Sequence, residues 1–341
     1  MRAVSNPKNP WRSAHTELLA PEPLQPVQVF EEEAKSVLTE NDSPDVPFRF
    51  AVNPYRGCHH GCAYCYARPT HQYLDFGAGT DFERKLIAKV NAPELLRREL
   101  GKRQTELRHE AIAFSGVTDC YQPIEATYEL TRRCLIVCRD LRQPAGVITK
   151  GALVQRDADL LAEVHAAAGA FVHLSIPTDD AHDARALEPY APSPERRFDA
   201  MAALHRSGVP VGVAVAPIIP GWNDHRIPGV LQRAKECGAE TAFLILLRLP
   251  AEVLPVFTER VREALPQRAD KVLSLLGQMR GTGGLQDARF GKRMRGEGAR
   301  WQAVEDLFKL WCRKLGLRAH GERSEITPKA RPVPKQGELF G

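Results

Sequence analysis

The 341-residue chain has no long hydrophobic segment. Its longest apolar stretch, Val209–Ile219, is interrupted by proline and glycine and is far shorter than the roughly 20 residues of a membrane-spanning helix. No apolar stretch follows Met1, so no signal peptide is expected. These absences predict a cytoplasmic protein without a membrane partner. In that compartment the eight cysteines indicate a metal, cluster or catalytic site, or buried thiols, rather than disulfides.

Internal repeats and a Gly-x-Gly-x-x-Gly turn after the first predicted strand are also absent, which argues against a solenoid and against a dinucleotide-binding fold. Hydrophobic residues make up 43% of the chain and charged residues 26%, as in ordinary globular proteins. The net charge of +5 is unevenly distributed. Residues 1–47 carry four basic and eight acidic residues, whereas residues 280–341 carry fourteen basic and seven acidic residues. The basic end suggests a polyanionic partner, or merely a solvated helix face and tail.

Proline and acidic residues dominate residues 1–47, which predicts an extended, partly disordered N-terminal arm. Residues 48–250 alternate short apolar strands with amphipathic helices, and residues 251–320 are expected to form a helical extension with a Gly/Arg-rich loop. Residues 321–341 read as a polar tail. The six predicted strands are Phe48–Val52, Ala111–Phe114, Gly146–Thr149, Phe171–Ile176, Val209–Ala216 and Ala242–Leu247.

The predicted helices share the 3.6-residue apolar period and follow the strands. They are Glu125–Leu141, Ala158–Ala168, Glu195–Ser207, Ile227–Cys237, Glu252–Ala264, Ala269–Met279 and Trp301–Leu315. Near-continuous apolar strands alternating with helices indicate an α/β fold built on a parallel sheet. The pattern alone allows either an open doubly wound sheet or a barrel.

The most specific motif is Cys58-His-His-Gly-Cys62-Ala-Tyr-Cys65, directly after the first strand. Thiolates are ligands of iron–sulfur clusters and of zinc. A closed zinc site needs a fourth ligand, which would have to be His59 or His60, because no second Cys-x-x-Cys knuckle occurs. Three cysteines on a [4Fe–4S] cluster instead leave one iron open to a further ligand.

This Cys-x-x-x-Cys-x-aromatic-Cys motif, with Tyr64 at the aromatic position, resembles that of radical S-adenosylmethionine (SAM) enzymes. The resemblance implies a partial (β/α)6 TIM-like barrel, a [4Fe–4S] cluster held by Cys58, Cys62 and Cys65, and SAM on the open iron. It also implies reductive cleavage of SAM to a 5′-deoxyadenosyl radical that abstracts a substrate hydrogen, and an electron donor of the flavodoxin or ferredoxin type.

Segments at the ends of later strands resemble those of the spore photoproduct lyase group of DNA-repair photolyase-like proteins. They are Thr118-Asp119, Ile148-Thr149-Lys150, Leu174-Ser175-Ile176 and Ala216-Pro217-Ile218-Ile219. By that resemblance Thr118, Lys150 and Ser175 bind SAM, with Lys150 pairing its carboxylate. Tyr64, Arg197 (or its neighbour Arg196) and Asp119 are further cofactor-binding candidates, and Asp119 alternatively caps the next helix.

Two residues are candidates for catalysis. Tyr66 matches a tyrosine that relays a hydrogen atom in the lyases. The lyases have a hydrogen-donating cysteine immediately before the pair that matches Thr118-Asp119, but this chain has Val117 there and Cys120 just after the pair. Cys120 takes that role only if its loop turns it inward, and the departure argues against thymine-dimer repair itself.

The other four cysteines, Cys134, Cys138, Cys237 and Cys312, lie in apolar helical contexts and are predicted to be core thiols. Three functional hypotheses remain open. The first is a radical SAM enzyme that repairs or modifies nucleic acid, and the second is one that acts on a small molecule or peptide. The third is a non-catalytic iron–sulfur or zinc protein.

Overall fold

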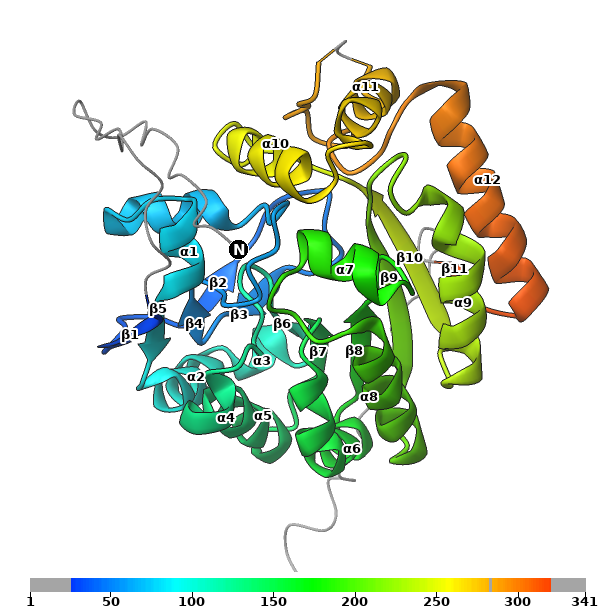
Figure 1. Cartoon of the computed structure of the whole chain (residues 1–341). Coiled ribbons are helices and arrows are strands. Elements are labelled where there is room, and N and C mark those ends of the chain that lie inside the picture. The colour runs from blue at the N-terminus through cyan, green and yellow to red at the C-terminus, as the bar shows by residue number, and fades with distance from the viewer. Residues whose placement is uncertain (1–25, 282–283, 320–341) are drawn as a thin grey trace, which may run out of the picture.

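The computed structural model describes residues 26–281 and 284–319, and its main element is an eight-stranded sheet. Strands β3, β6, β7, β8, β9 and β10 lie side by side in chain order and are parallel (Figure 1). Their bounds are Phe50–Val52, Ile112–Phe114, Ala145–Thr149, Ala170–Ser175, Val211–Ile218 and Thr241–Leu246. All six predicted strands are therefore confirmed, with shifts of one or two residues at their ends.

Two further strands form the edges of this sheet. β2 (Leu38–Glu40) pairs antiparallel with β3, and β11 (Arg318–Ala319) pairs parallel with β10. The strand order runs from β2 to β11 without closing on itself, so the sheet is a partial barrel. The expected α/β fold is confirmed, and so is the expected partial, TIM-like barrel.

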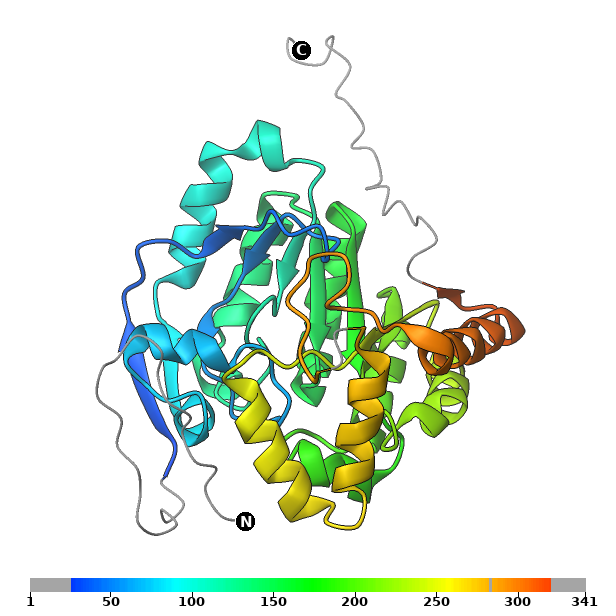
Figure 2. The same ribbon diagram turned by 90° about the horizontal axis from the view of Figure 1, so that it is seen from above.

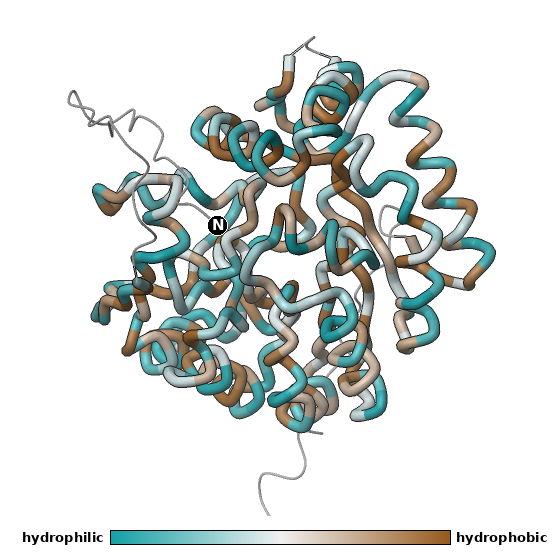
Figure 3. Tube along the Cα trace, viewed as in Figure 1, coloured by the Kyte–Doolittle hydropathy of each residue, from teal (hydrophilic) through white to brown (hydrophobic). Residues whose placement is uncertain are grey.

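Helices cover the outer face of this sheet, as Figure 1 shows. Those between or after the parallel strands are α2 (Ala92–Lys102), α3 (Gln104–Leu107), α4 (Glu125–Tyr128), α5 (Leu130–Asp140), α6 (Ala158–Ala167), α7 (Ala181–Leu187), α8 (Pro194–Arg206) and α9 (Ile227–Glu236). Short 3-10 helices are η1 (Arg68–Leu74), η2 (Ala152–Asp157) and η3 (Asp224–Arg226). The central strands β7, β8 and β9 are buried almost throughout, and hydrophobic residues concentrate in them (Figure 3).

Residues 26–47 of the expected arm contribute strands to two sheets. Besides β2, they form β1 (Gln28–Glu32), which pairs with β5 (Lys85–Lys89) in a small sheet completed by β4 (Tyr55–Arg56). The helix α1 (Thr80–Arg84) leads directly into β5. None of this small sheet was predicted, because its strands are short and its partners are distant in sequence. Residues 1–25 of the arm and the polar tail 321–341 lie outside the described residues.

The predicted helix Glu125–Leu141 is wrong in one respect, since it is two helices, α4 and α5. Glu129 adopts a left-handed conformation between them, with φ of 50°. The carboxylate of Glu125 accepts the backbone N–H groups of Thr131 (2.9 Å) and Arg132 (3.2 Å), in the first turn of α5. A side chain that caps the second helix competes with the continuous helix that the apolar period suggested.

After β10 the chain forms α10 (Val253–Ala264), α11 (Ala269–Met279) and α12 (Gly298–Leu315). α12 packs beside α9 and precedes β11, so the C-terminal helices end by returning to the main sheet. Cys134, Cys138 and Cys312 are buried, as predicted, and Cys237 is half-buried. Within the described residues no helix combines the length and the hydrophobicity needed to cross a membrane.

The central position of β8 makes a stability prediction. Leu174 is completely buried, so Leu174→Ala should lower the free energy of unfolding by about 2–5 kcal/mol through lost apolar contact and a residual cavity. Leu310→Ala on α12, where the side chain is 53% exposed, is the matched control and should change it by less than about 0.5 kcal/mol. Urea unfolding followed by tryptophan fluorescence measures both. Equal losses in the two variants would contradict the assigned core.

Candidate functional site

The carboxyl ends of the parallel strands meet at one edge of the barrel, and the predicted site residues follow these ends. The cysteine loop follows β3 and β4, the loops after β6 and β7 supply Thr118 and Lys150, and Ser175 is the last residue of β8. Parallel pairing in register places these loops next to one another. The barrel mouth is therefore the place where residues distant in sequence can act together.

The three cysteines of the motif lie close enough to interact electrostatically. Cys58 and Cys62 are buried and Cys65 is half-buried. Burial raises the thiol pKa values of all three, that of Cys62 to about 12, and neighbouring cysteines raise the pKa values of Cys58 and Cys62 further. Such thiols stay protonated unless a cationic centre offsets their charge, which is what metal ligation does. The donor set fits an iron–sulfur cluster.

The spacing of these donors disfavours a single zinc ion. In the described residues, no three ligand atoms from Cys58, Cys62, Cys65, His59 and His60 lie within 4.8 Å of one another. Four tetrahedral ligands at about 2.3 Å from one ion must approach each other to about 3.8 Å. A cluster accepts its thiolates on different iron atoms and so tolerates the wider spacing.

Two glycines and a glutamine hold the shape of the cysteine loop. Gly57 and Gly61 have φ values of 74° and 66°, and a Cβ atom on Gly57 would lie 2.8 Å from His71. The buried Gln122 side chain accepts from the N–H of His59 and donates to the carbonyl of Gly57, both at 2.9 Å. Sequence reasoning missed Gln122, because nothing in its local pattern marks it as a partner of a loop 63 residues earlier.

Asp119 joins the cysteine loop to the end of β7. Its carboxylate accepts the hydroxyl of Thr149 (2.5 Å) and the backbone N–H of Lys150 (2.7 Å), and it lies 3.4 Å from Nδ1 of His60. Burial alone raises the pKa of Asp119, but His60 and these donors outweigh it and lower that pKa below its usual range. Donors of the protein itself thus bind both oxygens of this carboxylate. A contact of Asp119 with a cofactor stays a prediction.

A buried glutamate brings together three of the predicted cofactor-binding residues. Glu188 accepts from Arg197 (2.5 Å) and from the hydroxyl of Tyr64, and it lies 3.8 Å from Nζ of Lys150. Arg197 also donates to the carbonyl of Ser175 at 2.9 Å. Arg197 pairs closely with Glu188, whereas the ammonium group of Lys150 lies farther from this carboxylate. Such a site accommodates an anionic group such as a carboxylate.

Glu188 was not found from the sequence, although it is the common partner of Tyr64, Lys150 and Arg197. It follows α7 in a loop and has no motif around it. Burial by itself lowers the pKa of Lys150, but Cys62 and Glu188 reverse this effect and raise it. Lys150 therefore keeps its charge inside the protein.

Thr118 and Ser175 are buried at the same edge, where each hydroxyl has a backbone acceptor. Thr118 donates to the carbonyl of Tyr55 at 2.8 Å and Ser175 to that of Ala216 at 3.2 Å. Their oxygen lone pairs still offer acceptors to a ligand. SAM binding by these two residues stays a prediction.

The two predicted catalytic residues have different surroundings. Tyr66 is 48% exposed, and its hydroxyl donates to the carbonyl of Gly116 at 2.8 Å. Enclosure of the hydroxyl and the nearby Cys65 raise the pKa of Tyr66 to about 12, so the phenol stays protonated near neutral pH. Cys120 has no exposed surface and belongs to the main core, and its own backbone N–H donates to the Ser115 hydroxyl at 2.9 Å.

Val117 stands immediately before the Thr118-Asp119 pair, at the position of the hydrogen-donating cysteine of the lyases. It packs against a small apolar cluster formed by Cys58, Ala67 and Phe82. The side chain next to this apolar cluster is thus an inert valine, whereas Cys120 lies in the core. The structure does not bring Cys120 to an accessible surface, and its catalytic role stays a prediction that this burial disfavours.

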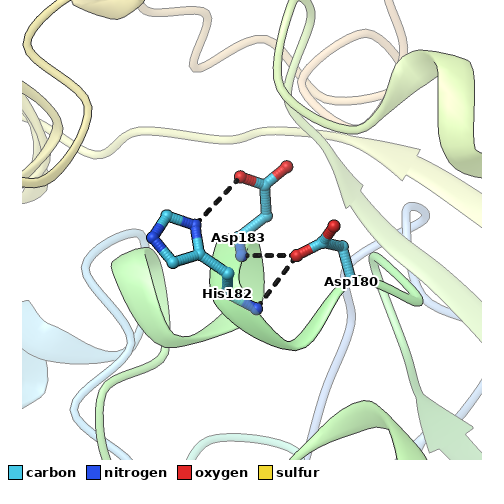
Figure 4. Close-up of side chains that lie close together, drawn as sticks. All are labelled: Asp180, His182 and Asp183. Atoms are coloured by element: carbon cyan, nitrogen blue, oxygen red, sulfur yellow. Dashed lines mark hydrogen bonds and ion pairs between the residues drawn. The ribbon is translucent and has the colours of Figure 1, made fainter.

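A separate group of Asp180, His182 and Asp183 lies at the start of α7 (Figure 4). Asp180 caps this helix by accepting the N–H groups of His182 and Asp183, both at 2.9 Å. Arg226 and Arg268 already pair with the two carboxylates, at 3.0 and 3.2 Å. The group therefore has a structural explanation and does not call for a metal ion.

Comparisons with known proteins agree with this geometry. A model of the Radical SAM superfamily matches residues 52–234, more than half of the chain. The chain belongs to this superfamily, whose members use a [4Fe–4S] cluster and SAM.

Particular relatives refine this assignment. An uncharacterised protein of Mycobacterium tuberculosis is 38% identical over 179 residues, which are 52% of each chain. A radical SAM Nα-GlyT isomerase of Pseudomonas phage M6 is 25% identical over 269 residues, 78% of this chain and 52% of that protein. The chain thus spans about half the length of these curated relatives.

Among solved structures, spore photoproduct lyase complexed with dinucleoside spore photoproduct aligns with a TM-score of 0.65 at 16% identity. The alignment covers 85% of this chain and 81% of the lyase. This similarity establishes a shared fold, including the partial barrel.

The cysteine loop makes a direct prediction. Anaerobically reconstituted wild-type protein should hold about four iron atoms per chain. Cys58→Ala should lose nearly all of this iron, because one thiolate ligand is removed. Cys134→Ala is the matched control, since this thiol is also buried but lies in the core, and it should keep the wild-type iron content. Iron and sulfide analysis measures both, and retention of a full cluster by Cys58→Ala would overturn the ligand assignment.

Proposed function

We propose that this radical SAM enzyme modifies or repairs nucleic acid. The observation that carries the proposal is a basic segment at the barrel mouth, the C-terminal strap (residues 284–297). It contains Arg289, Lys292, Arg293 and Arg295 but only two acidic residues. Nucleic-acid affinity comes largely from cations that contact phosphates, so a basic segment beside a catalytic mouth suits such a substrate.

The strap is held across the open side of the barrel. Arg293 pairs with Asp45, which precedes β3, and donates to the hydroxyl of Ser43 at 2.6 Å. At its other side, the carbonyl of Met294 accepts from the backbone N–H of Leu246 in β10 (3.1 Å). Figure 2 shows the orange strap lying next to the blue segment before β3. A substrate at the mouth would therefore meet the strap.

Two arginines of this region have no ion pair among the described residues. Arg295 is exposed on the strap, and Arg248 follows β10, where Tyr66 and Arg293 influence it electrostatically. Phe290 on the strap is 62% exposed, and the Arg293 guanidinium lies 4.2 Å from its ring centre. An exposed arginine and an exposed aromatic ring on the same strap are suited to phosphates and stacked bases.

One protein with this fold supports the same substrate class, the spore photoproduct lyase complexed with dinucleoside spore photoproduct. The phage relative is a radical SAM Nα-GlyT isomerase. The similarity to each is partial, so these names add support without identifying the reaction.

Within this function we assign roles to the site residues. Cys58, Cys62 and Cys65 would hold the cluster, and together the cluster and SAM supply hydrogen-abstracting radical chemistry. Lys150 would pair the SAM carboxylate, because it carries the charge that Glu188 leaves uncompensated. Tyr64, Thr118, Asp119, Ser175 and Arg197 would shape the remaining SAM contacts.

Tyr66 is the proposed hydrogen-atom relay, because its protonated phenol stands at the mouth. Delivery of the electron would come from a flavodoxin-like or ferredoxin-like donor. Cys120 would join the relay only after its loop rearranges.

The nucleic-acid proposal predicts salt-dependent binding. Single-stranded oligonucleotides should bind at low salt, and the Arg248→Ala/Arg295→Ala double variant should bind more weakly, with a salt slope smaller by about 1–2. Lys309→Ala/Lys314→Ala, on the exposed face of α12, is the charge-matched control and should keep the wild-type slope. Fluorescence anisotropy at several salt concentrations measures each. Absence of binding at low salt would sink the proposal and favour a small-molecule or peptide substrate.

The role of Lys150 has its own test. Lys150→Ala should weaken SAM binding by about tenfold or more, because a carboxylate loses its charged partner in a buried site. Calorimetry on reconstituted protein measures this affinity, with iron analysis to verify that the cluster is retained. Lys271→Ala, at an exposed position on α11, should bind SAM as the wild type does. Unchanged affinity in Lys150→Ala would refute the pairing.

A further inference from the structure

Arg68 is a fully buried charge three residues beyond the last cysteine of the motif. It is the first residue of η1, and none of its surface is exposed. Burying a guanidinium is costly unless hydrogen bonds and a counter-charge compensate it. The contacts of Arg68 therefore indicate what the buried charge does for this enzyme.

Half of the hydrogen bonds of its side chain are with the backbone of the cysteine loop. The carbonyl of Cys62 accepts from Nε and from a terminal nitrogen of Arg68, at 3.1 and 2.8 Å, and the carbonyl of Gly61 accepts at 3.2 Å. The other terminal nitrogen donates to the carbonyls of Ala78 and Gly79, at 3.1 and 2.9 Å. One planar group thus joins the cysteine loop to the segment that leads into α1.

A single buried carboxylate balances the charge. Glu83 of α1 is 2% exposed and pairs with Arg68 at 2.5 Å. Arg260 of α10 is also buried, and it lies 3.9 Å from the same carboxylate oxygen. Two guanidinium groups and one carboxylate leave an excess positive charge next to the cysteine loop.

We propose that Arg68 is a positioning residue for the cluster, which sets both the geometry of its loop and its reduction potential. Its fork fixes the backbone at Gly61 and Cys62, so Cys62 keeps the direction that a cluster ligand needs. Its charge stabilises the reduced, more negative cluster relative to the oxidised one and so makes the reduction potential less negative. The inference concerns the cluster and is independent of the substrate.

Three variants separate geometry from charge. Arg68→Lys keeps the charge but loses the planar fork, so it should bind fewer irons per chain while the clusters that form keep a potential near that of the wild type. Arg68→Met removes the charge as well, and its cluster should be about tenfold harder to reduce at a given potential, a shift of about 59 mV to more negative values. Glu83→Gln removes the counter-charge and should shift the potential to less negative values.

Arg280→Lys is the matched control. Arg280 is 3% exposed and likewise donates to backbone carbonyls, those of Leu247, Arg293 and Arg295, but it has no contact with the cysteine loop in the described residues. This variant should keep the wild-type iron content and potential. Redox titration followed by electron paramagnetic resonance, without SAM or substrate, measures the potentials.

Two results would overturn the proposal. One is a potential in Arg68→Met equal to that of the wild type; if Arg68→Met does not assemble a cluster, an unchanged or more negative potential in Glu83→Gln has the same force. The other is an equal loss of iron in Arg68→Lys and Arg280→Lys, which would mean that any buried arginine has this effect. Because the readouts use no nucleic acid, they do not depend on the substrate proposal.

Discussion

The parallel pairing of β3, β6, β7, β8, β9 and β10 is the constraint on which the site depends. It brings the carboxyl ends of six strands, spread over some two hundred residues, to one edge of the molecule. The cysteine loop, Asp119, Lys150 and Ser175 become neighbours only through this register. The sheet itself is open between its outer strands β2 and β11. There the C-terminal strap connects the segment before β3 with β10.

Charge inside the protein is balanced locally at this edge. Asp119 is occupied by backbone and side-chain donors, which tie two loops together. Glu188 faces both Arg197 and Lys150 and leaves one cation for a ligand. The Arg68 guanidinium donates hydrogen bonds to the backbone of the cysteine loop. Because an unpaired buried charge is costly, each of these groups restricts where its partners lie.

The departures from the lyase pattern also have a structural meaning. Val117 packs against the apolar cluster that contains Cys58, so an inert side chain stands where the lyases place a hydrogen-donating cysteine. Tyr66 keeps its place at the mouth, with its phenol protonated. The chain therefore combines the cysteine motif of its superfamily with different side chains around it. A reaction other than thymine-dimer repair is consistent with this arrangement.

The sequence by itself determined the local features: the six strands, the cysteine motif and the polar residues at strand ends, because each depends on the order of a few neighbouring residues. Tertiary structure alone decided which of them meet. Glu188, Gln122 and Arg68 have no motif, and their roles arise from partners brought close by folding. Packing likewise decided the burial of Cys120, and a capping carboxylate decided the break at Glu129. Tertiary contacts decide such cases because the local preference of a residue for a helix is worth less than about 1 kcal/mol, whereas burying an unsatisfied polar group costs more.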